Sequence, residues 1–137
     1  MKYFSFLALL FSSSVVFSVQ PHAYVTDQLG ASVHVIDTSN DTVQSIVGFD
    51  HPRVVKVTAD GTRAFIGCDN NTIRIIDTIT NRVLPEVIQV NHPIAMALTP
   101  QYIYVASADN TVSVINTLDY SPVHEILGFN NPQDIKV

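Results

Sequence analysis

The 137-residue sequence has a single cysteine and few basic side chains, and each shortage excludes a class of protein. Cys68 has no second cysteine with which to form an internal disulfide, and a structural zinc site needs two or more clustered thiolates. Seven Lys and Arg against twelve Asp and Glu give a formal net charge of −5. Because phosphate backbones and anionic membrane surfaces are held largely by Lys and Arg, we do not expect nucleic acid or a lipid surface as the main partner.

Patterns typical of catalysis are also missing from the sequence. It contains no Gly-rich phosphate loop, no serine nucleophile elbow and no paired catalytic carboxylates, and Glu86 and Glu125 are its only glutamates. Hydrophobic residues nevertheless make up 47% of the chain and charged residues only 14%. A chain this apolar can bury enough surface to fold compactly. We therefore expect a folded protein that needs no cofactor and is not an enzyme.

An apolar segment with one positive charge, Lys2, opens the chain at residues 1–18. It is too short and too rich in serine to span about 30 Å of hydrocarbon comfortably. Ser18, with Val16 two residues before it, suits cleavage by signal peptidase. The sequence therefore predicts an exported chain that begins after Ser18, has no membrane span and keeps its lone thiol buried. An uncleaved membrane anchor stays open as the alternative.

One pattern occurs three times in the remaining chain, with a period of about forty residues. The copies share an aromatic residue in one strand-like run and a proline before another, and in both sets the spacings are 41 and 39 residues: Tyr24, Phe65 and Tyr104; Pro52, Pro93 and Pro132. Repeats of this length indicate stacked supersecondary units, each of which buries its apolar faces against its neighbours.

Each period contains four short runs rich in Val, Ile, Thr, Tyr and Phe, bounded by Asn, Asp, Gly or Pro. In the central copy they fall at residues 54–57, 64–67, 72–76 and 83–90, and the run at 72–76 alternates with a period of two. The content predicts an all-β fold, a β-propeller with blades of four antiparallel strands and about three blades, rather than a helical solenoid. The expected blade units lie near 23–51, 52–91 and 92–131, with a last inner strand at 132–137.

The strings AYVTD at 23–27, VHVIDT at 33–38, IRIIDT at 73–78, VSVINT at 112–117 and VTADG at 57–61 resemble the YVTN family of β-propeller repeats. The resemblance covers essentially the whole of residues 19–137. It implies an exported or surface protein whose four-stranded blades surround a channel. The third copy departs from the pattern in loops alone, as where Asn116 replaces an aspartate.

Counted by position in the blade, the first copy supplies three strands, the next two copies supply four each, and residues 135–137 supply a lone first strand. A terminal first strand beside three N-terminal strands is the arrangement by which a propeller closes on a shared blade. Closed propellers typically have about four to eight blades, however, and these strands make three. Two alternatives follow: the chain is part of a longer propeller, or a homodimer completes a six-bladed ring.

Polar side chains gather in the fourth-to-first and second-to-third loops, which share one face of a propeller. The candidate binding residues on this face are His51, Arg53, His92, Asp27, Asp69 and Asp109. Zinc needs about three or four converging ligands, whereas repeats place equivalent residues on different blades, so we predict no metal site. The local alternative is that His or Asn before proline favours an extended backbone, and that loop aspartates form turns.

These observations leave three hypotheses for function. The first is an exported bacterial scaffold without enzymatic activity, periplasmic, secreted or on the cell surface, that presents its loops to a protein or a cell-surface polymer. The second is a lactonase-like or metal- or cofactor-associated enzyme completed by missing blades, with a site near His51, His92 and Asp69. The third is a DNA-binding propeller, which the negative charge disfavours.

Overall fold

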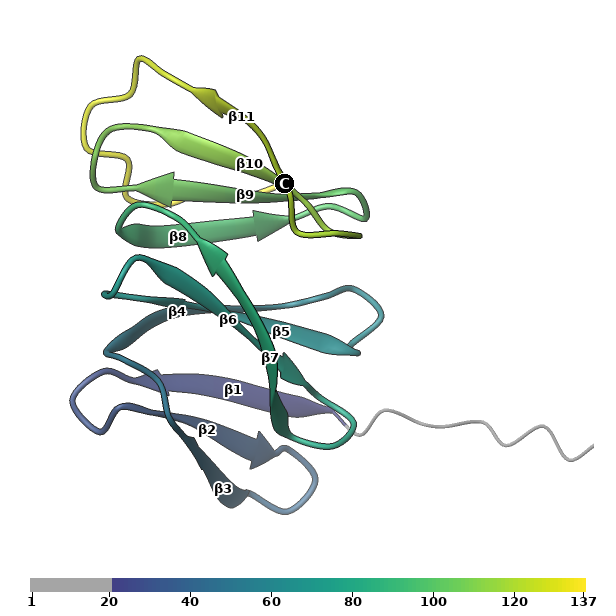
Figure 1. The fold of residues 1–137 in the computed structure, drawn as a ribbon. Helices are drawn as coiled ribbons and strands as arrows, with labels where there is room; N and C mark the ends of the chain where they lie inside the picture. The colour runs from purple at the N-terminus through teal and green to yellow at the C-terminus, as the bar shows by residue number, and fades with distance from the viewer. Residues whose placement is uncertain (1–20) are drawn as a thin grey trace, which may run out of the picture.

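The structure is a computed structural model that describes residues 21–137. The predicted signal peptide, residues 1–18, lies outside the described residues. Within them the chain forms eleven β-strands in three antiparallel sheets that stack face to face (Figure 1). The same residues include no helix long and apolar enough to cross a membrane.

Each sheet is one blade, and consecutive strands are neighbours within it. Blade 1 contains β1 (His22–Asp27), β2 (Ser32–Asp37) and β3 (Thr42–Val47). Blade 2 contains β4 (Pro52–Val57), β5 (Arg63–Cys68), β6 (Thr72–Asp77) and β7 (Arg82–Gln89). Blade 3 contains β8 (Pro93–Leu98), β9 (Tyr102–Ser107), β10 (Val112–Asn116) and β11 (Pro122–Ile126). The predicted all-β architecture of antiparallel blades is confirmed, with four strands in blades 2 and 3 and three in blade 1.

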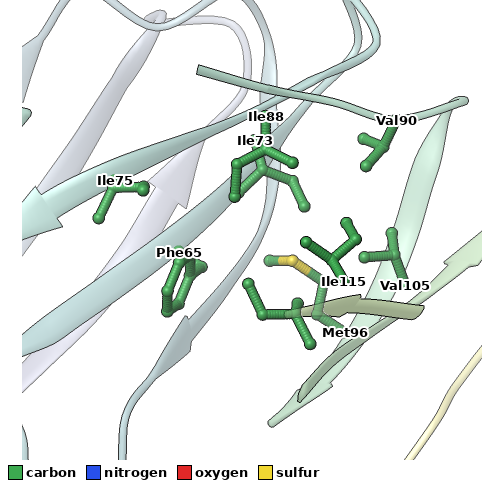
Figure 2. Packing of buried hydrophobic residues seen from close by; sticks show 9 residues of the cluster. Phe65, Ile73, Ile75, Ile88, Val90, Met96, Val105 and Ile115 are labelled. Carbon is green, nitrogen blue, oxygen red and sulfur yellow. The ribbon is translucent and has the colours of Figure 1, made fainter. Parts of the chain in front are cut away.

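Two apolar cores join the blades. Between blades 2 and 3, Phe65 and Ile73 face Met96 and Ile115, and all four are at most 2% exposed (Figure 2). Between blades 1 and 2 lies a second cluster that includes Cys68, whose side chain is fully buried. Burial raises the pKa of the Cys68 thiol, because desolvation disfavours the thiolate. The expectation of a buried thiol is therefore confirmed.

The repeated Asp-Thr or Asn-Thr pair explains how each third strand turns into the fourth. In blade 2, Asp77 Oδ1 accepts hydrogen bonds from the backbone N–H groups of Ile79 and Thr80, both at 3.0 Å. The hydroxyl of the next residue, Thr78, donates to the carbonyl of Gly61 in the neighbouring turn. Short polar side chains that bond nearby backbone groups stabilise turns in this way. The equivalent residues Asp37, Thr38, Asn116 and Thr117 make matching bonds.

The predicted strand at residues 135–137 does not form. The chain after β11 has no regular secondary structure, although Ile135 packs on the outward face of blade 3. A first strand pairs with the second strand of its own blade, and blade 3 already has its first strand in β8. The second strand without such a neighbour is β1, which belongs to the opposite end of the stack (Figure 1).

The outer strands of the three blades differ in regularity. The pairing of β7 with β6 shifts register between Arg74 and Ile76, and β7 contains Pro85. The pairing of β11 with β10 shifts between Val114 and Ile115. By contrast, β3 pairs with β2 without interruption along its whole length. Blade 1 therefore has the straightest outer edge.

Candidate binding rim

Two sets of loops meet on one face of the stack, at the left of the view in Figure 1. We call this face the loop rim. It consists of the second-to-third loops and the fourth-to-first loops: residues 28–31, 69–71, 108–111, 48–51, 90–92 and 127–131. Backbone hydrogen bonds join the two sets, as from Val90 N–H to the Asn71 carbonyl at 2.9 Å. The predicted placement of these loops on a common face is confirmed.

Asparagine side chains reinforce the loop rim in blades 2 and 3. Asn71 Oδ1 accepts a hydrogen bond from the backbone N–H of His92 at 3.0 Å. Asn110 Oδ1 accepts the same bond from Asn131 at 2.7 Å. In each pair the partners are 21 residues apart in the sequence, so one loop fixes the entry of the chain into the next blade. The sequence did not predict a role for these asparagines, although their equivalent positions in two repeats could have indicated a shared structural role.

The backbone before each repeated proline differs from expectation. His51, His92 and Asn131 have φ values of +47°, +35° and +57°, which lie in the left-handed region and not in the extended region. A following proline disfavours the right-handed helical region, and the sequence analysis took the extended alternative. At His92 and Asn131, the hydrogen bonds from the preceding loop hold the left-handed conformation.

Three of the six candidate residues meet at the junction of blades 1 and 2. Arg53 Nε donates to Asp69 Oδ1, and Gln28 Nε2 donates to the other carboxylate oxygen at 3.0 Å. His51 meets Asp69 through the backbone, because the N–H of Asp69 donates to the His51 carbonyl at 3.3 Å. Burial raises the pKa of Asp69, but the bonds from Arg53 and Gln28 with the nearby positive charges outweigh it, so the pKa is lowered. The Asp69 side chain therefore links two blades as an anion.

The other three candidates lie apart from this junction. Asp27 Oδ1 accepts from the backbone N–H of Gly30 at 2.9 Å, and its Oδ2 lies 3.3 Å from His34 Nε2. Asp109 bonds the backbone and hydroxyl of Thr111 within its own turn. His92 contributes its backbone N–H to the bond from blade 2 and exposes its side chain. The alternative that loop aspartates form turns therefore holds for Asp27 and Asp109.

The structure does not unite His51, His92 and Asp69 into one set of metal ligands. Among residues 21–137, no group of three or more His, Cys, Asp and Glu side chains is placed to hold a metal ion. The imidazole of His51 instead bonds Asp50, with Nδ1 and Oδ1 2.7 Å apart.

A groove of about 610 Å³ lies between blades 2 and 3, beside the loop rim. It is lined by polar and apolar residues, most of the apolar ones from β10 and β11: Asn71, Gln89, Val90, Asn91, Ser113, Val114, Ile115, Pro122, Val123, His124 and Glu125. The sequence did not predict this groove. Its lining comes from two repeats whose residues are tens of positions apart, so no local motif marks it.

A second hollow, of about 460 Å³, lies on the opposite face between the same two blades. Phe65 and Tyr120 meet edge to face there, with ring centroids 6.0 Å apart. Its charged side chains are engaged locally: Asp60 bonds its own turn, and Arg63 pairs with Asp77 at 3.0 Å. This hollow therefore offers mainly apolar surface.

No protein-family model and no curated protein matches the sequence. Solved structures do match the fold. The chain is similar to U3-55K, with a TM-score of 0.74 and 17% identity over 84% of this chain and 39% of that one. It is also similar to apo AztD from Citrobacter koseri, with a TM-score of 0.67 and 16% identity over 78% and 32% of the two chains. A chain of the mitotic checkpoint complex is similar as well, with a TM-score of 0.69 and 16% identity over 81% of this chain and 35% of that one.

The chain has a β-propeller fold. Its three stacked antiparallel sheets and its similarity to these structures agree on that point. The described blades span about a third of the length of the structures they match, since the covered share of those chains is 32% to 39%. Function is not inherited from a fold, so the activity of this propeller has to be argued from its own surface.

Proposed function

We propose that this chain is an exported, non-enzymatic β-propeller repeat protein of the YVTN type, which binds a protein or a cell-surface polymer through its loop rim. The observation that carries the proposal is the hydrogen bonding of neighbouring loops by Asn71 and Asn110, beside the groove between blades 2 and 3. Loops held in one conformation lose little conformational entropy when a partner binds. The YVTN-like strings and the apolar N-terminal segment support the family and the export.

The chemistry of the groove favours a large polar partner. Its lining residues include Gln89, Asn91, Glu125 and Val123, all of which are exposed. Mixed surfaces of this kind are typical of interfaces that form and dissociate, in which polar groups around an apolar centre provide specificity. We expect a second copy of the chain to be a partner as well, in a homodimer that completes a six-bladed ring.

Site-specific photo-crosslinking in cells that export the protein tests this function. A photoreactive amino acid at Glu125, which pairs with Ser113 on the side of blade 3 that faces blade 2 and lines the groove, is expected to give a discrete crosslinked product larger than the chain or its dimer. The same amino acid at Ile79, 64% exposed in a turn on the opposite face, is the matched control and is expected to give none. Equal crosslinking at both positions would contradict binding at the groove beside the loop rim.

Two further measurements test the remaining parts of the proposal. N-terminal sequencing of the exported protein is expected to find residue 19 first, whereas an intact Met1 would show an uncleaved anchor. The purified protein is expected to leave a panel of lactones and esters unchanged. Hydrolysis that is lost in the Asp69→Asn variant would instead establish the enzyme alternative.

A further inference from the structure

Residues 132–137 occupy the place of a first strand, although they pair with no strand. Their sequence, PQDIKV, matches PRVVKV of β4, with proline, lysine and the final valine in the same places. The chain also enters this segment as it enters β8, because Asn110 bonds Asn131 as Asn71 bonds His92. Both the sequence of this segment and the hydrogen bond at its start therefore match those of an inner strand, which indicates that it can serve as the inner strand of another blade.

The side chain of Ile135 confirms that position. Val55 in β4 packs on the core shared with blade 1, and Met96 in β8 packs on the core shared with blade 2. Ile135, at the matching place, packs on blade 3 against Ala106 and Val112. Each of the three residues thus contacts the blade before its own, as expected if residues 132–137 begin a further blade.

Among residues 21–137, blade 1 has no strand in the place that this segment could fill. Its sheet order is β1-β2-β3, and β1 corresponds in the repeat to the second strands β5 and β9. The free edge of β1 is therefore the edge that β4 covers in blade 2 and β8 covers in blade 3. An uncovered edge presents unpaired backbone donors and acceptors to any suitable strand.

We propose that residues 132–137 of one copy of this chain add to the free edge of β1 in a second copy. The exchange is reciprocal, so two copies make two identical junctions and a closed ring of six blades. This inference rests on the homodimer proposed above and specifies the strands that form it. One copy cannot make the junction alone, because blades 1 and 3 are at opposite ends of the stack (Figure 1).

The other blades define the register of the added strand. In blade 2, Pro52 pairs with Cys68, a shift follows at Arg53, and Val55 then pairs with Ile66. Blade 3 repeats the register, with Pro93 opposite Ser107 and Met96 opposite Val105. Carried to the junction, this register places Ile135 opposite Val25.

The outward faces of the end blades fit the same assembly. On blade 1, Val25, Val43 and Val47 are 45%, 60% and 72% exposed. On the outward face of blade 3, Ile126 pairs with Val112 of the cluster that holds Ile135 and is 39% exposed. Removing apolar surface of this kind from water favours association. The proposed junction brings blade 1 of one copy against blade 3 of the other and covers both faces.

Disulfide trapping tests the register. The full chain carrying Val25→Cys and Ile135→Cys is expected to oxidise to a covalent dimer on a non-reducing gel, because cross-strand partners lie within reach of a disulfide. The matched control carries Thr26→Cys and Ile135→Cys, and is expected to stay uncrosslinked because Thr26 points to the other face of β1. Native Cys68 is fully buried and present in both variants.

Light scattering on the unmodified chain, with circular dichroism on both reduced variants, completes the test. We expect twice the mass of one chain, and β-sheet spectra that show both variants to be folded. A dimer in which folded Val25→Cys/Ile135→Cys fails to crosslink would overturn the strand exchange but leave the homodimer intact. A monomer, or a crosslink formed within one chain, would overturn both. The groove photo-crosslink described above would be unaffected by either result.

Discussion

The side chain of Asn71 fixes the backbone of His92, with Oδ1 3.0 Å from the amide nitrogen. Ala31 stands at the matching place in blade 1 and has a left-handed φ of +49°. Asparagine tolerates this conformation better than alanine does, and its side chain would reach the His51 amide as Asn71 reaches His92. We therefore expect Ala31→Asn to raise the free energy of unfolding by about 1 kcal/mol in urea titrations. Asn71→Ala is the matched control and is expected to lower it by a similar amount. Unchanged stability in Ala31→Asn would show that blade 1 orders its loops differently.

Gly67 allows β5 to approach both its own blade and the next one. A Cβ atom there would lie 2.7 Å from Val54 Cγ1 and 3.1 Å from the ring of Pro93. Gly67→Ala is expected to lower the free energy of unfolding by roughly 1–3 kcal/mol, as overpacking typically does. The measurement is denaturant unfolding of the variant, alone and combined with Val54→Ala. The second change removes the nearer contact, so the loss caused by Gly67→Ala should be smaller in that background. An equal loss in both would assign the effect to Pro93 or to the backbone.

Asp77 makes part of the stability depend on pH. The hydrogen bond from the Thr80 amide is the largest cause of its lowered pKa; burial opposes it, and Arg63 contributes further. A native pKa below the unfolded value gives stability that is present above about pH 4 and is lost as the pH falls through the native pKa. Asp77→Asn removes this titration and keeps a turn acceptor, as Asn116 does toward Leu118 at 2.8 Å.

Unfolding free energies measured from pH 7 to pH 3 are therefore expected to fall less steeply for Asp77→Asn than for the unmodified chain. A slope remains in the variant, because Asp37, Asp60 and Asp119 also have lowered pKa values from hydrogen bonds within their turns. Identical slopes for the two proteins would show that the Asp77 carboxyl titrates alike in the native and unfolded states.

Thr78 ties two turns together on the face opposite the loop rim. Its hydroxyl donates to the Gly61 carbonyl, and the residue is 5% exposed. Thr78→Val keeps the shape but leaves that carbonyl without its partner, and is expected to cost about 1–2 kcal/mol in thermal or urea unfolding. In Thr38→Val the lost bond goes to the carbonyl of Pro21 at a more exposed site, where water can replace it. The loss there should be smaller, and a larger one would contradict burial as the cause.

The strands of each blade could be predicted from the sequence, because they follow a local pattern of alternating apolar residues and turn residues. Alternation of apolar residues at 72–76 and the turn residues that follow predicted β6 and its hairpin, which the structure places at Thr72–Asp77. The period of about forty residues then extended the prediction to the other blades. Aspartates that bond backbone groups two or three residues away were likewise expected from composition alone.

Features that depend on contacts between repeats could not be predicted from the sequence. The groove beside the loop rim joins Asn71 to Glu125, and no spacing rule relates them. The left-handed His92 depends on a side chain 21 residues earlier, which outweighs the local preference before proline. The expected strand at 135–137 failed for a similar reason, because pairing needs a partner that one copy of these blades does not place nearby.

The uninterrupted edge of β3 determines where the folded protein is most exposed to unwanted association. Register shifts and prolines twist an outer strand away from incoming chains, and β7 has both while β11 has a register shift and begins at a proline. Nothing comparable interrupts β3, whose Val43 and Val47 lie largely in solvent without a charged residue along the strand. Closing the ring at β1 would leave this outer edge open. Fibrillar growth at high concentration would then begin at the β3 edge of blade 1.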